Sequence, residues 1–100
     1  MIEQVNDMED LLPTEYYLSQ NFPDPFKEKT TIKYCLPEEI RVKLEIFNIR
    51  GKIVTTLLDE VKEPGTYQVE LSARKIKEGL YLYQLTAGNI IITKRMLILK

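Results

Sequence analysis

From Lys29 onward, apolar and polar residues alternate almost without interruption, and turn-forming residues recur at short intervals. A period of two is the pattern of a β-strand that buries one face. It predicts six strands, over residues 30–36, 41–48, 52–58, 66–72, 80–86 and 90–99, and residues 16–20 are expected to add a seventh at an edge. Because no segment predicts a long helix, the pattern indicates an all-β fold, an antiparallel β-sandwich.

Individual strands specify which side chains are expected to face the core. In residues 41–48, Val42, Leu44 and Ile46 fall on one face. In residues 52–58, Val54 and Leu57 are three positions apart, which predicts a bulge or a twisted edge. Residues 73–78 are expected to form a short connection of at most one helical turn.

The last expected strand differs from the others. Residues 90–92 are three isoleucines and residues 96–99 are again apolar, so both faces of the strand are apolar. Such a strand is either central and covered on both faces or available to a partner. Lys94 and Arg95 interrupt the run, as charges do that protect a strand against edge-to-edge aggregation.

A proline-rich stretch, QNFPDPF, precedes the first long strand. Proline fixes its own φ and favours extended backbone in the residue before it. The stretch is therefore expected to be a stiff extended rod that ends a linker and fixes the first strand. Phe22 and Phe26 are expected to pack against the sandwich.

Charge changes sharply along the chain. Residues 1–26 hold six acids and no base, whereas residues 27–100 hold fourteen bases against nine acids, a net of +5. This step indicates a flexible acidic linker over residues 1–15 and one folded domain over residues 16–100. Two solvated surfaces of opposite sign explain the step, and an acidic tail that regulates a basic face is the alternative. The first residues have neither a basic region nor a long apolar run, so no signal peptide is expected in this chain.

Residue types that carry chemistry are scarce. The chain has no histidine and a single cysteine, Cys35, which is interpreted as a passive small side chain. The adjacent acids 38–39 and 59–60 fall in turns without the spacing of a calcium loop, and solvation explains them. The basic residues 74, 75 and 77 are not expected to bind nucleic acid, because Tyr81 and Tyr83 are expected to face the core and leave no stacking platform. We therefore expect no enzyme, no metal, no cofactor, no nucleic acid and no small-molecule substrate.

Several spaced segments resemble one family. QNFPDPF, TTIKYCLPE, VKLEIFNIRGKIVTTL, GTYQVEL, EGLYLYQLTAG and TKRMLILK occur in the order found in the type A C-terminal sorting domain of the type IX secretion system. The resemblance covers residues 18–100. It implies an immunoglobulin-like sandwich of six to seven strands. It also implies a sorting signal for an N-terminally fused cargo, which the outer-membrane secretion machinery recognises and a surface sorting peptidase removes. The expected location is the cell surface or the medium, after passage through the periplasm and the outer membrane.

The resemblance assigns roles to particular residues. The family's entry motif corresponds to Gln20, Asn21, Phe22, Pro23, Asp24, Pro25 and Phe26, with Asp24 where asparagine is usual. Its turn glycines correspond to Gly51, Gly65, Gly79 and Gly88. The basic and apolar end that the machinery is thought to recognise corresponds to Lys94, Arg95, Met96, Leu97, Ile98, Leu99 and Lys100.

Two alternatives stay open. The strand motifs are also similar to the immunoglobulin-like domain of the flagellar hook-capping protein, but residues 71–78 are short, basic and without tryptophan, unlike that family. An assembly module that pairs through its C-terminal strand is the second alternative.

Overall fold

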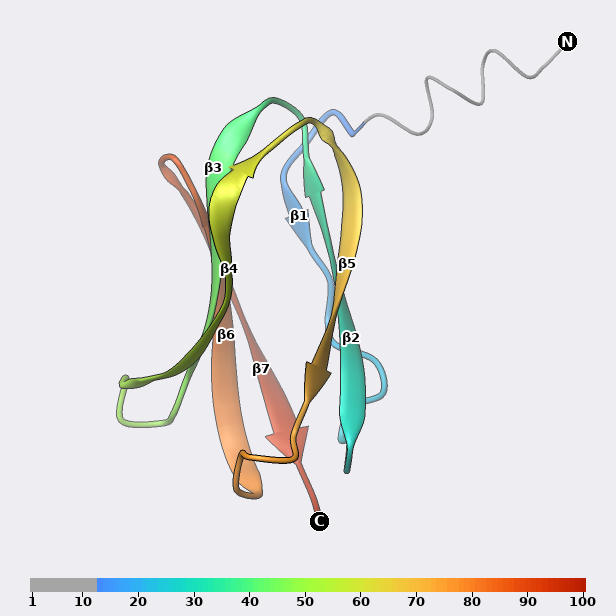
Figure 1. Cartoon of the computed structure of the whole chain (residues 1–100), viewed down its shortest axis with the longest axis vertical. Coiled ribbons are helices and arrows are strands. Elements are labelled where there is room, and N and C mark those ends of the chain that lie inside the picture. The colour runs from blue at the N-terminus through green and yellow to red at the C-terminus, as the bar shows by residue number, and fades with distance from the viewer. Residues whose placement is uncertain (1–12) are drawn as a thin grey trace, which may run out of the picture.

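The structure is a computed structural model that describes residues 13–100, so the expected linker (residues 1–15) lies almost wholly outside the described residues. Seven strands follow one another, with no helix between them in residues 13–100 (Figure 1). They are β1 (Tyr17–Leu18), β2 (Lys29–Leu36), β3 (Ile40–Phe47), β4 (Ile53–Lys62), β5 (Gly65–Ser72), β6 (Gly79–Ala87) and β7 (Ile90–Ile98). The all-β prediction is confirmed.

The strands form two antiparallel sheets that pack face to face. One sheet has three strands in the order β1-β2-β5, and the other has four in the order β4-β3-β6-β7. Figure 1 shows the two layers side by side, with β4 and β5 toward the viewer. Each layer therefore has one edge strand on either side of the sandwich: β4 and β5 on one side, β7 and β1 on the other.

The core lies between the sheets and comes from the alternation within each strand. Val42, Leu44 and Ile46 of β3 are completely buried, as are Tyr83 and Leu85 of β6. Strand β2 contributes Ile32, Tyr34 and Leu36, while Met96 and Ile98 of β7 complete the wall. The inward faces predicted for these strands are confirmed.

Strand β4 is longer than expected, because it continues past residue 58 to Lys62. Its register against β3 shifts between Leu44 and Glu45 and again between Ile46 and Phe47. These shifts confirm the predicted irregularity. Bulges of this kind increase the local twist of an edge strand.

Two glycines occupy turns that need left-handed backbone. Gly51 has φ of +85° in the β3–β4 turn, and Gly88 has φ of +60° in the β6–β7 turn. In the first turn, the Asn48 side-chain oxygen accepts hydrogen bonds from the N–H groups of Arg50 and Lys52. The connection over residues 73–78 is a turn in which the Ile76 N–H donates to the Ala73 carbonyl at 3.1 Å.

The other two glycines begin strands and share one arrangement. Two residues after each glycine is a tyrosine: Tyr67 follows Gly65, and Tyr81 follows Gly79. The Tyr67 hydroxyl donates to the Glu63 carbonyl, and the Tyr81 hydroxyl donates to the Lys77 carbonyl, both at 2.8 Å. Each ring also covers its glycine, since a Cβ there would meet the ring at 3.5 Å or 3.7 Å. The two Gly-x-Tyr segments thus fasten the starts of β5 and β6 in the same way.

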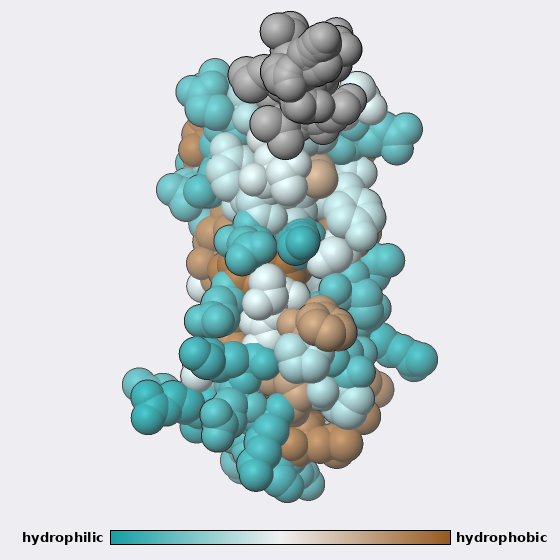
Figure 2. Space-filling model, turned by 90° about the vertical axis from the view of Figure 1, so that its right-hand side faces the viewer, coloured by the Kyte–Doolittle hydropathy of each residue, from teal (hydrophilic) through white to brown (hydrophobic). Residues whose placement is uncertain are grey.

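The outer face of the three-stranded sheet is mostly hydrophilic, with hydrophobic side chains gathered toward its lower end (Figure 2). Lys33 of β2 and Gln68 and Glu70 of β5 are exposed on this face. Polar residues on the solvated face are the usual arrangement of an antiparallel sheet.

Candidate functional site: the entry strap and the C-terminal segment

The entry motif, Gln20–Phe26, connects the two sheets, and we call it the entry strap. At one end Phe22 forms an antiparallel bridge with Thr31 of β2. At the other end Phe26 forms a parallel bridge with Ile98 of β7. The strap therefore closes the side of the sandwich where β1 and β7 lie.

Two expectations for this segment are wrong. It is not an extended rod: both X–Pro peptide bonds, Phe22–Pro23 and Asp24–Pro25, are cis, and the chain bends between its two bridges. Phe22 does not pack against the sandwich, because its side chain is 79% exposed. Phe26 is 4% exposed, so the packing expected for that ring is confirmed.

The orientation of Phe22 follows from its neighbour. Consecutive side chains of extended backbone point to opposite faces, so one of Asn21 and Phe22 faces inward and the other outward. Asn21 is the inward one, 2% exposed. Its Nδ2 donates to the Pro23 carbonyl at 3.1 Å and to Thr30 Oγ1 at 3.0 Å, and its Oδ1 accepts from Gln20 Nε2 at 2.8 Å. Buried amide groups need such partners, and here the strap and Thr30 of β2 supply them.

The strap occupies the outer edge of β7. The Phe26 N–H donates to the Leu97 carbonyl at 3.1 Å, and the Leu99 N–H donates to the Phe26 carbonyl at 2.9 Å. Two strap side chains extend this pairing. Asp24 Oδ1 accepts from the Leu97 N–H at 3.0 Å, and Gln20 Nε2 donates to the Arg95 carbonyl at 2.6 Å. The residues expected to be recognised are therefore paired on both sides, with β6 and with the strap.

The last residue is fastened as well. Lys100 Nζ donates to the carbonyls of Ala73 and Ile76 at 2.7 and 2.6 Å, and its N–H donates to Glu78 Oε1 at 2.9 Å. Both carbonyls belong to the β5–β6 connection. The Lys100 ammonium group thus binds the β5–β6 connection and fixes the end of the C-terminal strand to it.

We call residues Lys94–Lys100 the C-terminal segment. Met96 and Ile98 are completely or almost completely buried, Lys94 and Leu97 are half-buried, and Arg95 and Leu99 are exposed. The structure brings this segment beside the entry strap, whereas Gly51, Gly65 and Gly88 lie in turns and a strand start elsewhere. Gly79 begins the strand that pairs with the segment and stands opposite Ile98.

Tyr83 contributes to this site in a way that the sequence pattern does not reveal. Its hydroxyl donates to the Ser19 carbonyl at 2.6 Å, which ties β6 to the residue before the strap. Burial of the ring raises the pKa of Tyr83 to about 12. The alternation of β6 predicts that this ring is inside but gives no indication of its hydrogen-bond partner.

The other candidates are ordinary surface features. Glu38 accepts a hydrogen bond from the Tyr16 hydroxyl at 2.5 Å, which is the main reason that the pKa of Tyr16 is raised to about 12. Asp59 pairs with Arg41 at 3.0 Å, and Glu60 lies 3.7 Å from Lys62. Within residues 13–100, no three acidic or cysteine side chains are grouped as metal ligands would be. Among the same residues no helix is long and apolar enough to cross a membrane.

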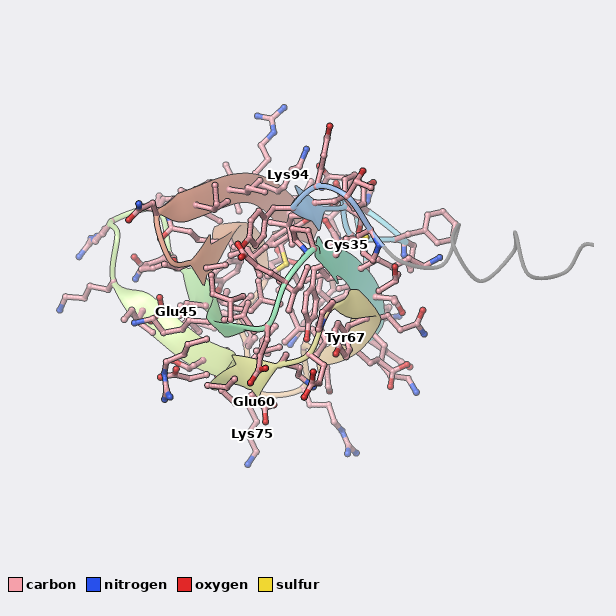
Figure 3. All side chains as sticks on the ribbon, turned by 90° about the horizontal axis from the view of Figure 1, so that it is seen from above. Cys35, Glu45, Glu60, Tyr67, Lys75 and Lys94 are labelled. Atoms are coloured by element: carbon pink, nitrogen blue, oxygen red, sulfur yellow. The ribbon has the colours of Figure 1, made fainter. Side chains whose placement is uncertain are left out.

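On the β4–β5 side, the two sheets leave a cavity of about 590 Å³. Leu57, Leu71 and Ile76 form part of its apolar wall, and Arg74 and Lys75 line its rim. Figure 3, which looks down the sandwich, places Lys75 and Lys94 on opposite sides of the molecule. The basic cluster therefore lies away from Lys94, but it borders the end of the C-terminal segment, because Lys100 binds the connection that carries it. Tyr83 is buried and Tyr81 is packed against the core, as expected.

These features describe a β-sandwich module whose entry strap and C-terminal segment are bound together at one edge. The family model of the secretion system C-terminal sorting domain matches residues 20–99, from the first residue of the strap to the next-to-last residue of the C-terminal segment. The chain therefore belongs to this family, the C-terminal sorting domains of type IX secretion. No curated protein and no solved structure matches the chain.

Membership confirms the resemblance seen in the sequence and supports a sorting-signal role. A domain of this family implies secretion machinery, a cargo attached on its N-terminal side, and a destination outside the cell or on its surface. The family is not known to be catalytic.

Proposed function

We propose that this domain is a non-catalytic C-terminal sorting signal that directs an attached cargo to the type IX secretion system. The cargo is then attached to the surface or released, and a surface sorting peptidase separates it from the domain. The C-terminal segment is the part that the machinery recognises.

The observation that supports this proposal is that hydrogen bonds hold the C-terminal segment in one conformation within the fold. The strap binds the backbone of Arg95, Leu97 and Leu99. The backbone N–H of Lys100 and its ammonium group are bound by the β5–β6 connection. A segment held in this way presents the same side chains on every copy, which lowers the entropy cost of recognition. The cargo is attached N-terminal to the strap, whereas the machinery binds the C-terminal segment.

Assembly through the C-terminal strand is less well supported. Pairing between copies needs a free strand edge. The strap occupies that edge from Arg95 to Leu99. Self-association of the isolated domain in light scattering would favour this alternative.

Reporter export tests the proposal. A reporter with a signal peptide is fused in front of residues 14–100 and produced in a cell with type IX secretion. We expect export to be lost when residues 96–100 are deleted. Because that deletion removes buried Met96 and Ile98, Arg95→Ala provides a variant with an intact core, and we expect it to reduce export. Lys52→Ala, an exposed site in the β3–β4 turn, is the matched control. Undiminished export of both the deletion and the Arg95 variant would contradict the proposal.

A further inference from the structure

The entry strap limits how a partner can recognise the C-terminal segment. A partner that adds a strand needs free backbone N–H and C=O groups along the edge of β7. The Arg95 carbonyl, both backbone groups of Leu97 and the Leu99 N–H are bound by Gln20, Asp24 and Phe26. In the folded domain, the segment is therefore recognised through its side chains.

Only one face of β7 offers these side chains. Met96 and Ile98 point into the core. The alternate residues point outward: Arg95 is exposed, and Leu97 is half-buried. A partner bound to the folded domain thus meets Arg95 and Leu97 on the outer face of the four-stranded sheet.

That outer face continues across the neighbouring strands. Leu97 stands opposite Leu80 of β6, and Arg95 stands opposite Leu82. Leu82 is in turn opposite Phe47 of β3, and Phe47 is opposite Ile53 of β4. The side chains of Leu80, Leu82 and Ile53 are 44%, 38% and 56% exposed. We call this surface the outer apolar patch: Phe47, Ile53, Leu80, Leu82 and Leu97.

The patch differs from the other end of the same outer face. There Gln84 donates to Thr93 at 3.0 Å and Arg41 forms an ion pair with Asp59. The exposed apolar side chains at that end, Ile91 and Val61, stand opposite the polar residues Thr86 and Arg41 and not opposite other apolar side chains. Large contiguous apolar surfaces on a folded domain mark interaction sites. This one lies at the end of the sheet that carries the C-terminal segment.

We propose that the outer apolar patch, together with Arg95, is the docking surface for the protein component of the export machinery that recognises the C-terminal segment. The inference rests on the proposed function and extends it from the last strand to β6, β3 and β4. The patch is continuous with the segment through Leu97, which identifies the occupant as the partner that recognises the segment. That partner presents an apolar surface with a carboxylate opposite Arg95.

The test removes the apolar surface and leaves the C-terminal segment intact. In the reporter fusion, Leu80 and Leu82 are both replaced by threonine, which suits a strand. Loss of two exposed anchors at the centre of an interface is expected to reduce export about tenfold or more. Val61→Thr is the matched control, because Val61 is 53% exposed and pairs with Arg41 at the polar end of the sheet. Arg95→Glu is a second variant, at an exposed residue, whose result does not depend on whether the fold tolerates the two threonines. Its export is expected to fall as well.

The outcomes separate this inference from the proposed function. If the leucine variants and Arg95→Glu are exported like the control while deletion of residues 96–100 abolishes export, the docking surface is wrong and the sorting signal stands. If the deletion also leaves export unchanged, the proposed function fails. A dimer of the purified domain that the leucine substitutions dissociate would assign the patch to self-association. Cosedimentation with lipid vesicles that the same substitutions abolish would assign it to a membrane. Either result would overturn the inference.

Discussion

The two open sides of the sandwich are built differently. On the β1–β7 side, the entry strap crosses from one sheet to the other and pairs with both. On the β4–β5 side, no comparable segment of residues 13–100 pairs with both sheets, and a cavity of about 590 Å³ lies between β4, β5 and the β5–β6 connection. The strap therefore closes only one of the two edges. That edge is the one that carries the C-terminal segment.

The largest expected effect lies on the strapped side. Phe26→Ala removes a ring that is 4% exposed between the strap and the core. Loss of a buried phenylalanine costs about 3–5 kcal/mol, so the free energy of unfolding is expected to fall by about that amount. Phe22→Ala is the matched control, because its ring is 79% exposed and its loss is expected to change stability by about 0.5 kcal/mol or less. Chemical denaturation measures both, and equal effects would show that the strap does not depend on its buried end.

The next largest effect of a single side chain is expected from each buried tyrosine at high pH. Burial raises the pKa of both Tyr34 and Tyr83 to about 12, from an unfolded value of about 10. A group whose pKa is raised on folding contributes stability that is fully present below pH 10 and is lost as the pH rises through 12. Each tyrosine accounts for a loss of roughly 2–3 kcal/mol over that range.

Substituting the two tyrosines one at a time distinguishes the contribution of the strap from that of the rest of the core. Tyr83→Phe is expected to flatten the loss between pH 10 and 12, and it removes the hydrogen bond to Ser19. Tyr34→Phe is expected to flatten the loss of stability over the same pH range and to leave the hydrogen bond to Ser19 intact, since that bond comes from Tyr83. The Tyr34 ring stacks instead on Tyr67, with 5.3 Å between the ring centroids. Denaturation midpoints at pH 8, 10 and 11.5 give the comparison. A pH profile that neither substitution changes would mean that other groups cause the alkaline loss.

The smallest effect concerns the bend itself. Asn21→Ala leaves the Thr30 hydroxyl and the Pro23 carbonyl with fewer partners, and a loss of about 1–3 kcal/mol is expected. The loss is expected to appear locally, as faster amide hydrogen exchange at Leu97 and Leu99, whose N–H groups are bound by the strap. Lys52→Ala, an exposed site in the turn that leads into β4 on the open side, is the control and should leave both amides unchanged. Uniform acceleration across all strands would show a global effect and would remove the distinction between the two sides.

Much of this fold is present in local sequence. Strict alternation in β3 and at the end of β6 predicts the buried rows, because each side chain is assigned to a face by its position alone. The edge strand near residues 16–20 and the irregular β3–β4 pairing also follow from local patterns. Family membership follows from the order of the motifs.

The site is less predictable because its contacts join distant residues. Phe22 faces solvent since Asn21 finds a buried partner in Thr30, nine positions away. Lys100 reads as a free basic end in the sequence, yet it binds carbonyls 24 and 27 positions earlier. The outer apolar patch does have a sequence signal. Leu80 and Leu82 alternate with Tyr81 and Tyr83, so this strand is apolar on both faces.

The closures made by Leu97, Leu99 and Lys100 join residues that are far apart in the chain, 73 positions in the case of Leu97 and Asp24. Leu97 and Leu99 close the strap, and the Lys100 ammonium group closes the β5–β6 connection, so during synthesis each closure has to wait for its later partner. A chain truncated before Leu97 would lack all of these closures, and its loose strap would be open to proteolysis.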